Sequence, residues 1–108
     1  MIKLSDLLAG IQIKSIEGDK DKLVSGITDN SKDVKNDFLF FAIYGNKFDG
    51  HDFIDKAIKK GSNTIICTKL PKSLHEKITY ILVEDIRDSV YSISSNFYGN
   101  PESKIKIV

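Results

Sequence analysis

The sequence predicts an α/β domain, in which helices flank a layered, largely parallel or mixed sheet. Two observations carry this prediction. Short apolar runs bounded by turn residues recur at 38–44, 64–68 and 79–84, a pattern typical of strands buried on both faces. Segments with apolar residues at helical spacing alternate with these runs, at about 52–60 and 86–98.

The first part of the chain carries the weaker signals. Residues 3–9 suit a short helix that Gly10 ends, and a charged turn follows around Gly18. Residues 24–28 (VSGIT) predict a strand that runs into the polar stretch DNSKDVKND. The run at 38–44 (FLFFAIY) then predicts a strand in the middle of the sheet.

The second part is marked more clearly. The helix at 52–60 has aspartates early and lysines late, which suits the helix dipole, and Gly61 is a natural C-terminal cap. A last helix runs from about 86 to 98, and IKIV at 105–108 predicts the start of another strand. The stripe along the last helix consists of Ile86, Val90, Ile93 and Phe97.

Composition limits the class of protein. The 108 residues suffice for one domain, and a hydrophobic fraction of 41% supports a core. The net charge of +1, from 16 basic and 15 acidic residues, argues against a nucleic-acid partner. No apolar run has the length of a membrane span and no signal peptide is evident, so we expect a cytoplasmic protein without a membrane partner.

Few residues offer catalytic or metal chemistry. Cys67, the only cysteine, lies within a predicted buried strand and is expected to be an inert thiol. His51 and His75 lie far apart without a metal-ligand pattern. Neither G-x-x-x-x-G-K-[ST] nor G-x-G-x-x-G occurs, so neither of these phosphate-binding loops is present. We therefore expect no catalytic residue and no metal site in this chain.

Two polar loops remain as candidates for binding. One follows the strand at 24–28, and the other, at 45–50 (GNKFDG), precedes the helix at 52–60. Each loop on its own is explained by turn or N-cap chemistry. Alternatively, free backbone N–H groups at the helix start, with Lys47 beside them, hold phosphate oxygens. Because the loops flank the same predicted strand, they could face one shared pocket.

At this point the order of motifs resembles a known family. TDNSK, FFAIYGNKFDGHDFI, ILVEDIRDSV and NFYGNP occur in the order found in the N-terminal domain of the Mur ligases. The resemblance extends from about Leu23 to Val108. Within the family, the ending at 97–103 (FYGNPES) is most similar to the MurE type, the UDP-N-acetylmuramoyl-tripeptide synthetases, whereas DGHDFI is shared with the MurF type.

The resemblance implies an ATP-dependent, amide-forming ligase of bacterial peptidoglycan biosynthesis. In such enzymes ATP phosphorylates the carboxylate of UDP-N-acetylmuramoyl-L-alanyl-D-glutamate. The amine of meso-diaminopimelate or L-lysine then attacks the acyl phosphate. The N-terminal domain holds the UDP end, a central domain binds ATP and Mg2+, and a C-terminal domain brings the amino acid. Residues 1–108 are accordingly expected to be a single UDP-substrate-binding domain, able to bind but not to catalyse.

The resemblance also implies which residues contact UDP-MurNAc. Asn30 stands where the family motif usually has Asp, and Lys32 stands where it has Arg, so a planar fork becomes a point charge. The implied contact residues are Asp29, Asn30, Ser31, Lys32, Asn46, Lys47 and Phe48.

Three hypotheses follow from the sequence. The first is the UDP-MurNAc-dipeptide-binding domain of a MurE-type ligase, acting as a monomer. The second is the corresponding domain of a MurF-type ligase, which takes the UDP-MurNAc-tripeptide. The third, from another class, is a non-enzymatic α/β interaction module whose polar loops are connections only.

Overall fold

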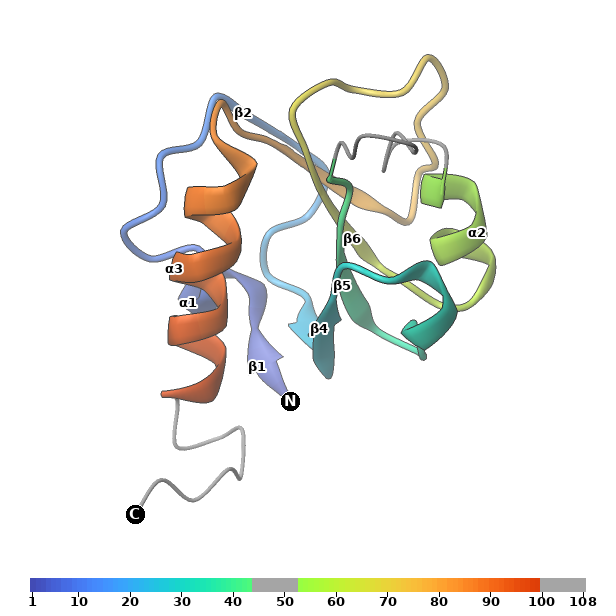
Figure 1. The fold of residues 1–108 in the computed structure, drawn as a ribbon. Coiled ribbons are helices and arrows are strands. Elements are labelled where there is room, and N and C mark those ends of the chain that lie inside the picture. Colours follow the sequence, from blue (N-terminus) through green and yellow to red (C-terminus); the bar gives the residue numbers. More distant parts are fainter. Residues whose placement is uncertain (44–52, 100–108) are drawn as a thin grey trace.

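A five-stranded sheet lies at the centre of the computed structural model, which describes residues 1–43 and 53–99 (Figure 1). Its order is β2-β7-β6-β5-β4, and neighbouring strands are parallel except for β2, which is antiparallel to β7. A separate two-stranded ladder joins β1 and β3. The strands are β1 (Ile2–Lys3), β2 (Ser15–Glu17), β3 (Leu23–Val24), β4 (Gly26–Thr28), β5 (Phe38–Phe41), β6 (Thr64–Cys67) and β7 (Thr79–Leu82).

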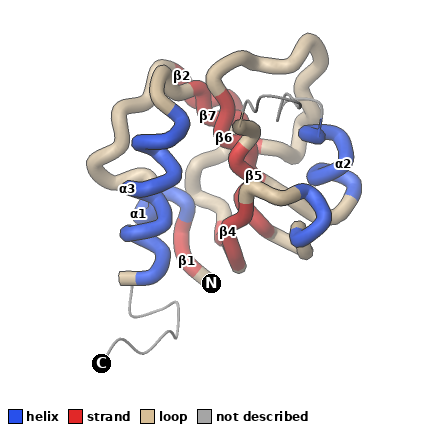
Figure 2. Tube along the Cα trace, in the orientation of Figure 1, coloured by secondary structure: helices blue, strands red, loops and turns tan. Residues whose placement is uncertain are grey.

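Helices cover both faces of the large sheet (Figure 2). On one face lie α1 (Leu4–Leu7) and α3 (Ile86–Tyr98), together with β1. On the other face lie α2 (Ile54–Lys59) and the 3-10 helix η1 (Ser31–Asp33). This arrangement confirms the predicted α/β architecture with a largely parallel sheet.

The alternation of side chains along the strands produces two cores. In β5, Leu39 and Phe41 are buried on the side of α1 and α3, whereas Phe40 is buried on the side of α2. In β6, Ile66 and Ile65 divide between the two faces in the same way. The prediction that the run beginning at Phe38 is buried on both faces is therefore confirmed, although its strand ends at Phe41.

The last helix matches its prediction in length and in face. Asp85 caps it, because its side chain accepts a hydrogen bond of 3.1 Å from the N–H of Asp88. The amide of Asn96 donates to the carbonyl oxygens of Leu7 and Ala9 at 2.8 and 3.0 Å, which ties α3 to the end of α1. The predicted stripe of Ile86, Val90, Ile93 and Phe97 packs into this core.

The prediction of one strand over 24–28 is wrong. β3 pairs with β1, whereas β4 pairs with β5 in the large sheet. Between them, the N–H of Ser25 donates to the carbonyl of Asp37 and its hydroxyl donates to the carbonyl of Asn36. The local pattern could not separate the two strands, because the difference lies in their partners. The strand predicted at 105–108 lies outside the described residues.

Among residues 1–43 and 53–99, none of the helices combines the length and the apolarity that crossing a membrane requires.

Candidate functional site

The polar loop at 29–33 directly follows β4. The neighbouring strand β5 precedes the second predicted loop in the sequence. β4 and β5 are parallel neighbours, with Thr28 opposite Phe40, so both end at the same edge of the sheet (Figure 1). In open α/β sheets ligands bind at this carboxyl edge. The chain leaving β5 at this edge continues toward Asn46, Lys47 and Phe48, which lie outside the described residues.

Local hydrogen bonds shape the first loop. The hydroxyl of Thr28 accepts from the N–H of Asn30 at 3.1 Å, and the side chain of Asn30 accepts from the N–H of Lys32 at 3.0 Å. The N–H of Asp33 donates to the carbonyl of Asn30 at 3.0 Å. Asn30 is thus the N-cap of η1, so its side-chain oxygen is already engaged in shaping the turn.

This loop lines a cavity of about 500 Å³, which we call the loop hollow. Residues from three elements meet there: the end of β4 with η1, the buried strand β5, and the residue preceding α2. The structure therefore brings four of the predicted site residues together. The loop hollow is lined by Asp29, Asn30, Ser31, Lys32, Phe40 and Phe53.

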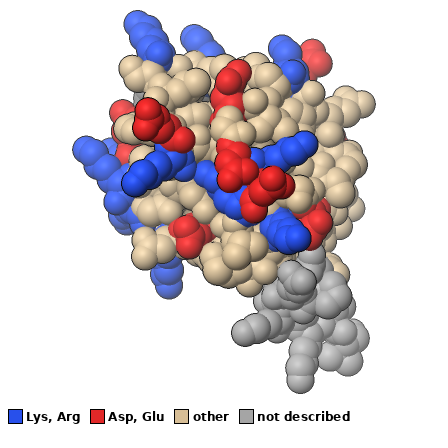
Figure 3. All heavy atoms as spheres, turned by 180° about the vertical axis from the view of Figure 1, so that it is seen from behind, with Lys and Arg blue, Asp and Glu red and all other residues tan. Residues whose placement is uncertain are grey.

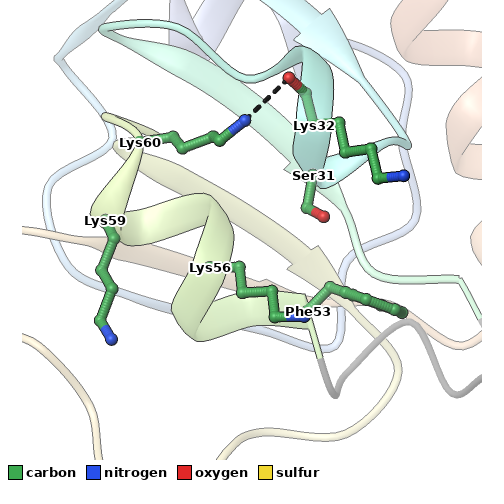
Figure 4. A pocket seen from close by; sticks show the side chains of 6 residues that line it. All are labelled: Ser31, Lys32, Phe53, Lys56, Lys59 and Lys60. Carbon is green, nitrogen blue, oxygen red and sulfur yellow. Dashed lines mark hydrogen bonds between the residues drawn. The ribbon is translucent and has the colours of Figure 1, made fainter.

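A second cavity, of about 300 Å³, adjoins the first between η1 and α2, and we call it the lysine hollow (Figure 4). The two hollows share Ser31, Lys32 and Phe53. The Ser31 side chain points toward α2 (Figure 4), and its hydroxyl makes no hydrogen bond among the described residues. This hydroxyl is therefore available to a ligand. The lysine hollow is lined by Ser31, Lys32, Phe53, Lys56, Lys59 and Lys60.

The charge of the paired hollows is unevenly distributed. Asp29 places a carboxylate near the end of β4, whereas four exposed lysines surround the side toward α2. The ammonium of Lys56 lies 4.9 Å from the centre of the Phe53 ring, a cation–π distance. The four lysines make this side of the hollows suited to an anionic ligand. On the face of the molecule seen from behind, by contrast, acidic and basic side chains are interspersed (Figure 3).

Sequence reasoning missed the part that α2 plays in the site. It assigned Phe53 to the apolar face of the helix and the lysines to the helix dipole. Phe53 does pack against the core, but it also lines both hollows. The available signal was the run of lysines at 56, 59 and 60, on a helix that directly follows a predicted binding loop.

Cys67 is buried, as predicted, and burial raises the pKa of its thiol to about 11. A thiol with this pKa is almost entirely protonated near neutral pH, so it is a poor nucleophile. Its Sγ lies 3.8 Å from the carbonyl oxygen of Ile81, within the core beneath α2. Cys67 therefore belongs to the core and not to the site.

The largely parallel sheet, with a cavity of polar and aromatic residues at its carboxyl edge, defines an α/β domain with a candidate ligand site. Comparison with known proteins specifies the family: residues 23–103 match the Mur ligase family, catalytic domain. The chain belongs to the Mur ligase family.

Two relatives show the level of similarity. The chain is 40% identical, over 99% of its length, to the UDP-N-acetylmuramoyl-L-alanyl-D-glutamate–2,6-diaminopimelate ligase of Phocaeicola vulgatus. It is 41% identical, over 98% of its length, to the UDP-N-acetylmuramyl-tripeptide synthetase of Borrelia garinii subsp. bavariensis. The chain spans 22% of the length of each of these relatives.

Solved structures show the same fold. A crystal structure of MurF from Acinetobacter baumannii matches 91% of this chain and 21% of its own with a TM-score of 0.74, at 18% identity. MurF ligase from Thermotoga maritima, solved in complex with ADP, matches 68% of this chain and 17% of its own with a TM-score of 0.58, at 34% identity. The five-stranded layered arrangement is thus that of Mur ligase structures.

Mur ligases as a family depend on ATP and magnesium. Among residues 1–43 and 53–99, no group of three or more His, Cys, Asp or Glu side chains is arranged to hold a metal ion. The printed sequence also lacks the glycine-rich phosphate loop G-x-x-x-x-G-K-[ST].

Proposed function

We propose that this chain is the N-terminal domain of a MurE-type ligase and binds the UDP end of UDP-N-acetylmuramoyl-L-alanyl-D-glutamate. The observation that carries the proposal is the loop hollow, in which Asp29 to Lys32 line one cavity at the carboxyl edge of a parallel sheet. Relatives of about 40% identity named as tripeptide synthetases or diaminopimelate-adding ligases support the same substrate.

Different residues bind different parts of the ligand in this proposal. The Ser31 hydroxyl makes no hydrogen bond among the described residues, so it can donate to an oxygen of the ligand. Lys32 and the lysines of α2 attract the diphosphate as point charges. The Asp29 carboxylate accepts from a hydroxyl or N–H group of the nucleoside. Asn46, Lys47 and Phe48 complete the contacts in this proposal.

The full ligase adds the third residue of the stem peptide in the cytoplasm, as a monomer. ATP and Mg2+ are held by a central domain outside these 108 residues, and the incoming amino acid by a C-terminal domain. The relatives' greater length leaves room for both domains. A MurF-type ligase has less support, because the MurF ligase of Thermotoga maritima is 34% identical over 68% of the chain, whereas the tripeptide-forming relatives are 40% and 41% identical over 99% and 98% of it.

Titration of UDP-N-acetylmuramoyl-L-alanyl-D-glutamate against the ¹⁵N-labelled chain tests the proposal. We expect amide shifts to cluster at 28–32 and 45–50, with UDP alone reproducing most of them. Titration with N-acetylmuramic acid, which lacks the nucleotide, serves as the control and should leave these amides unmoved. Scattered or absent shifts with the nucleotide sugar would instead favour an interaction module without a small ligand.

A further inference from the structure

One contact links the two elements that enclose the lysine hollow. The ammonium of Lys60 donates to the carbonyl oxygen of Lys32 at 3.0 Å (Figure 4). Lys60 follows the last residue of α2, and Lys32 lies in the middle of η1. The carbonyl of a residue in so short a helix lacks a regular intrahelical partner, so an ammonium donor satisfies it with a charge-assisted bond.

The α2 end of this contact is firmly held. Gly61, with φ of 117°, lies so close to Asn36 that an added Cβ would be 2.5 Å from its side-chain oxygen and 2.8 Å from its Cα. The carbonyl of Gly61 also accepts from the N–H of Asp37 at 2.8 Å. The end of α2 is thus docked on the connection that leads into β5, which makes it a rigid base for the Lys60 side chain.

The η1 end has fewer contacts of its own: Val34, the residue after η1, is buried in the same core as Ile54 and Ala57, but none of the three residues of η1 is buried. Apart from the Lys60 contact, the hydrogen bonds that residues of this turn make within the described part of the chain are local, among Thr28, Asn30, Lys32 and Asp33. Such bonds fix the shape of the turn but not its distance from α2. The distance between η1 and α2 sets the width of the lysine hollow, into which the Ser31 side chain points (Figure 4).

We propose that Lys60 is a positioning residue for nucleotide-sugar binding, because its ammonium holds η1 at a fixed distance from α2. The proposal rests on the proposed function for its ligand. The Lys60 ammonium donates to the Lys32 carbonyl and does not contact the ligand. It affects binding by fixing the positions of Ser31 and Lys32.

Lys59 provides a charge-matched control. It is exposed, lines the same hollow and points away from η1 (Figure 4), and its ammonium makes no hydrogen bond among the described residues. Lys59→Met and Lys60→Met remove the same charge from adjacent positions and keep a similar apolar stem. The difference between the two variants therefore measures the bond to Lys32 separately from the loss of charge.

The experiment measures the Kd for UDP-N-acetylmuramoyl-L-alanyl-D-glutamate by calorimetry, with hydrogen exchange of the η1 amides measured in the absence of ligand. We expect the Kd of Lys60→Met to exceed that of Lys59→Met by roughly three- to ten-fold, the range of one lost hydrogen bond. Exchange at the Asp33 N–H should quicken in Lys60→Met alone. Lys60→Arg, which retains a donor, should recover most of the affinity.

Equal Kd values and equal exchange in the two methionine variants would overturn the positioning role while leaving the proposed function in place. If the unaltered chain does not bind the nucleotide sugar, the proposed function fails instead. In that case the exchange measurement still decides whether Lys60 holds η1.

Discussion

The two ends of the sheet are built differently. At the amino edge, side chains bridge distant segments: the ammonium of Lys22 donates to the carbonyls of Asn63 and Lys77 at 2.9 and 3.0 Å. The amide of Asn63 donates in turn to the carbonyl of Leu23 at 2.9 Å. At the carboxyl edge, the bonds shaping the 29–33 loop are local, and the long-range one among the described residues comes from Lys60.

This difference separates stability from binding. At the amino edge, partial burial lowers the pKa of the Lys22 ammonium in spite of the nearby Asp19 and Asp37 carboxylates. At the carboxyl edge, the Ser31 hydroxyl has no partner within the described residues and faces a cavity. Loops that bind ligands are generally drawn from the less stabilised parts of a fold. Substitutions at the amino edge should therefore reduce stability, and those at the carboxyl edge should reduce binding.

The largest loss of stability is expected from Gly61→Ala. The new Cβ meets Asn36 at less than 3 Å, and a φ of 117° is strained for alanine. We expect a loss of roughly 2–3 kcal/mol, which lowers the Tm of a domain of this size by about 10–20 °C. Thermal unfolding followed by circular dichroism measures it.

Gly10→Ala is the matched control, because Gly10 has a φ of 79° but no atom within 4 Å of an added Cβ. It should lose about 1 kcal/mol, the strain alone. If the two variants unfold at the same temperature, the close approach of Gly61 to Asn36 does not contribute to stability.

A smaller loss of stability is expected from Asn63→Ala. The variant loses the bond to the Leu23 carbonyl and the one accepted from the Thr64 hydroxyl at 2.9 Å. We expect about 1–2 kcal/mol, measured by urea unfolding. Asn30→Ala, which removes an amide at the carboxyl edge, should lose about 0.5 kcal/mol. A larger loss for Asn30 than for Asn63 would reverse the comparison between the two edges.

The smallest change in stability is expected from Ser31→Ala. Because no described residue bonds to the hydroxyl, the Tm should stay within about 2 °C, as for surface substitutions in general. The Kd for UDP should nevertheless rise roughly two- to ten-fold, which corresponds to one hydrogen bond. Calorimetry and thermal unfolding of the same sample measure both quantities. A large fall in Tm would instead make Ser31 a structural turn residue.

Much of the architecture was predictable from local patterns. The helix predicted from about 86 to 98 is confirmed as Ile86–Tyr98, because its apolar stripe and its closing Gly99 and Pro101 are local signals. The division of 24–28 into two strands was not predictable. Val24 and Ile27 both look like strand residues, and only their different partners, Ile2 and Leu39, separate them.

The candidate site was predictable in part. Asp29 to Lys32 were singled out as a polar loop after a strand and lie together at a cavity. The capping role of Asn30 was left open by the sequence, and the structure shows it. Phe53 and Lys60 were not recognised as site residues, because their own segment reads as an ordinary amphipathic helix. Asn46, Lys47 and Phe48 remain predictions.

The sequence by itself determined the two longer helices and the three buried strands that begin at Phe38, Thr64 and Thr79, because those elements depend on spacing and turn residues within a few positions. The sequence also indicated the family, through motifs spread along the chain. Only the tertiary structure decided that η1 and α2 enclose a common cavity and that Lys60 spans it. These relations join residues 28 positions apart, and such contacts depend on how strands pair and helices pack, which no local pattern specifies.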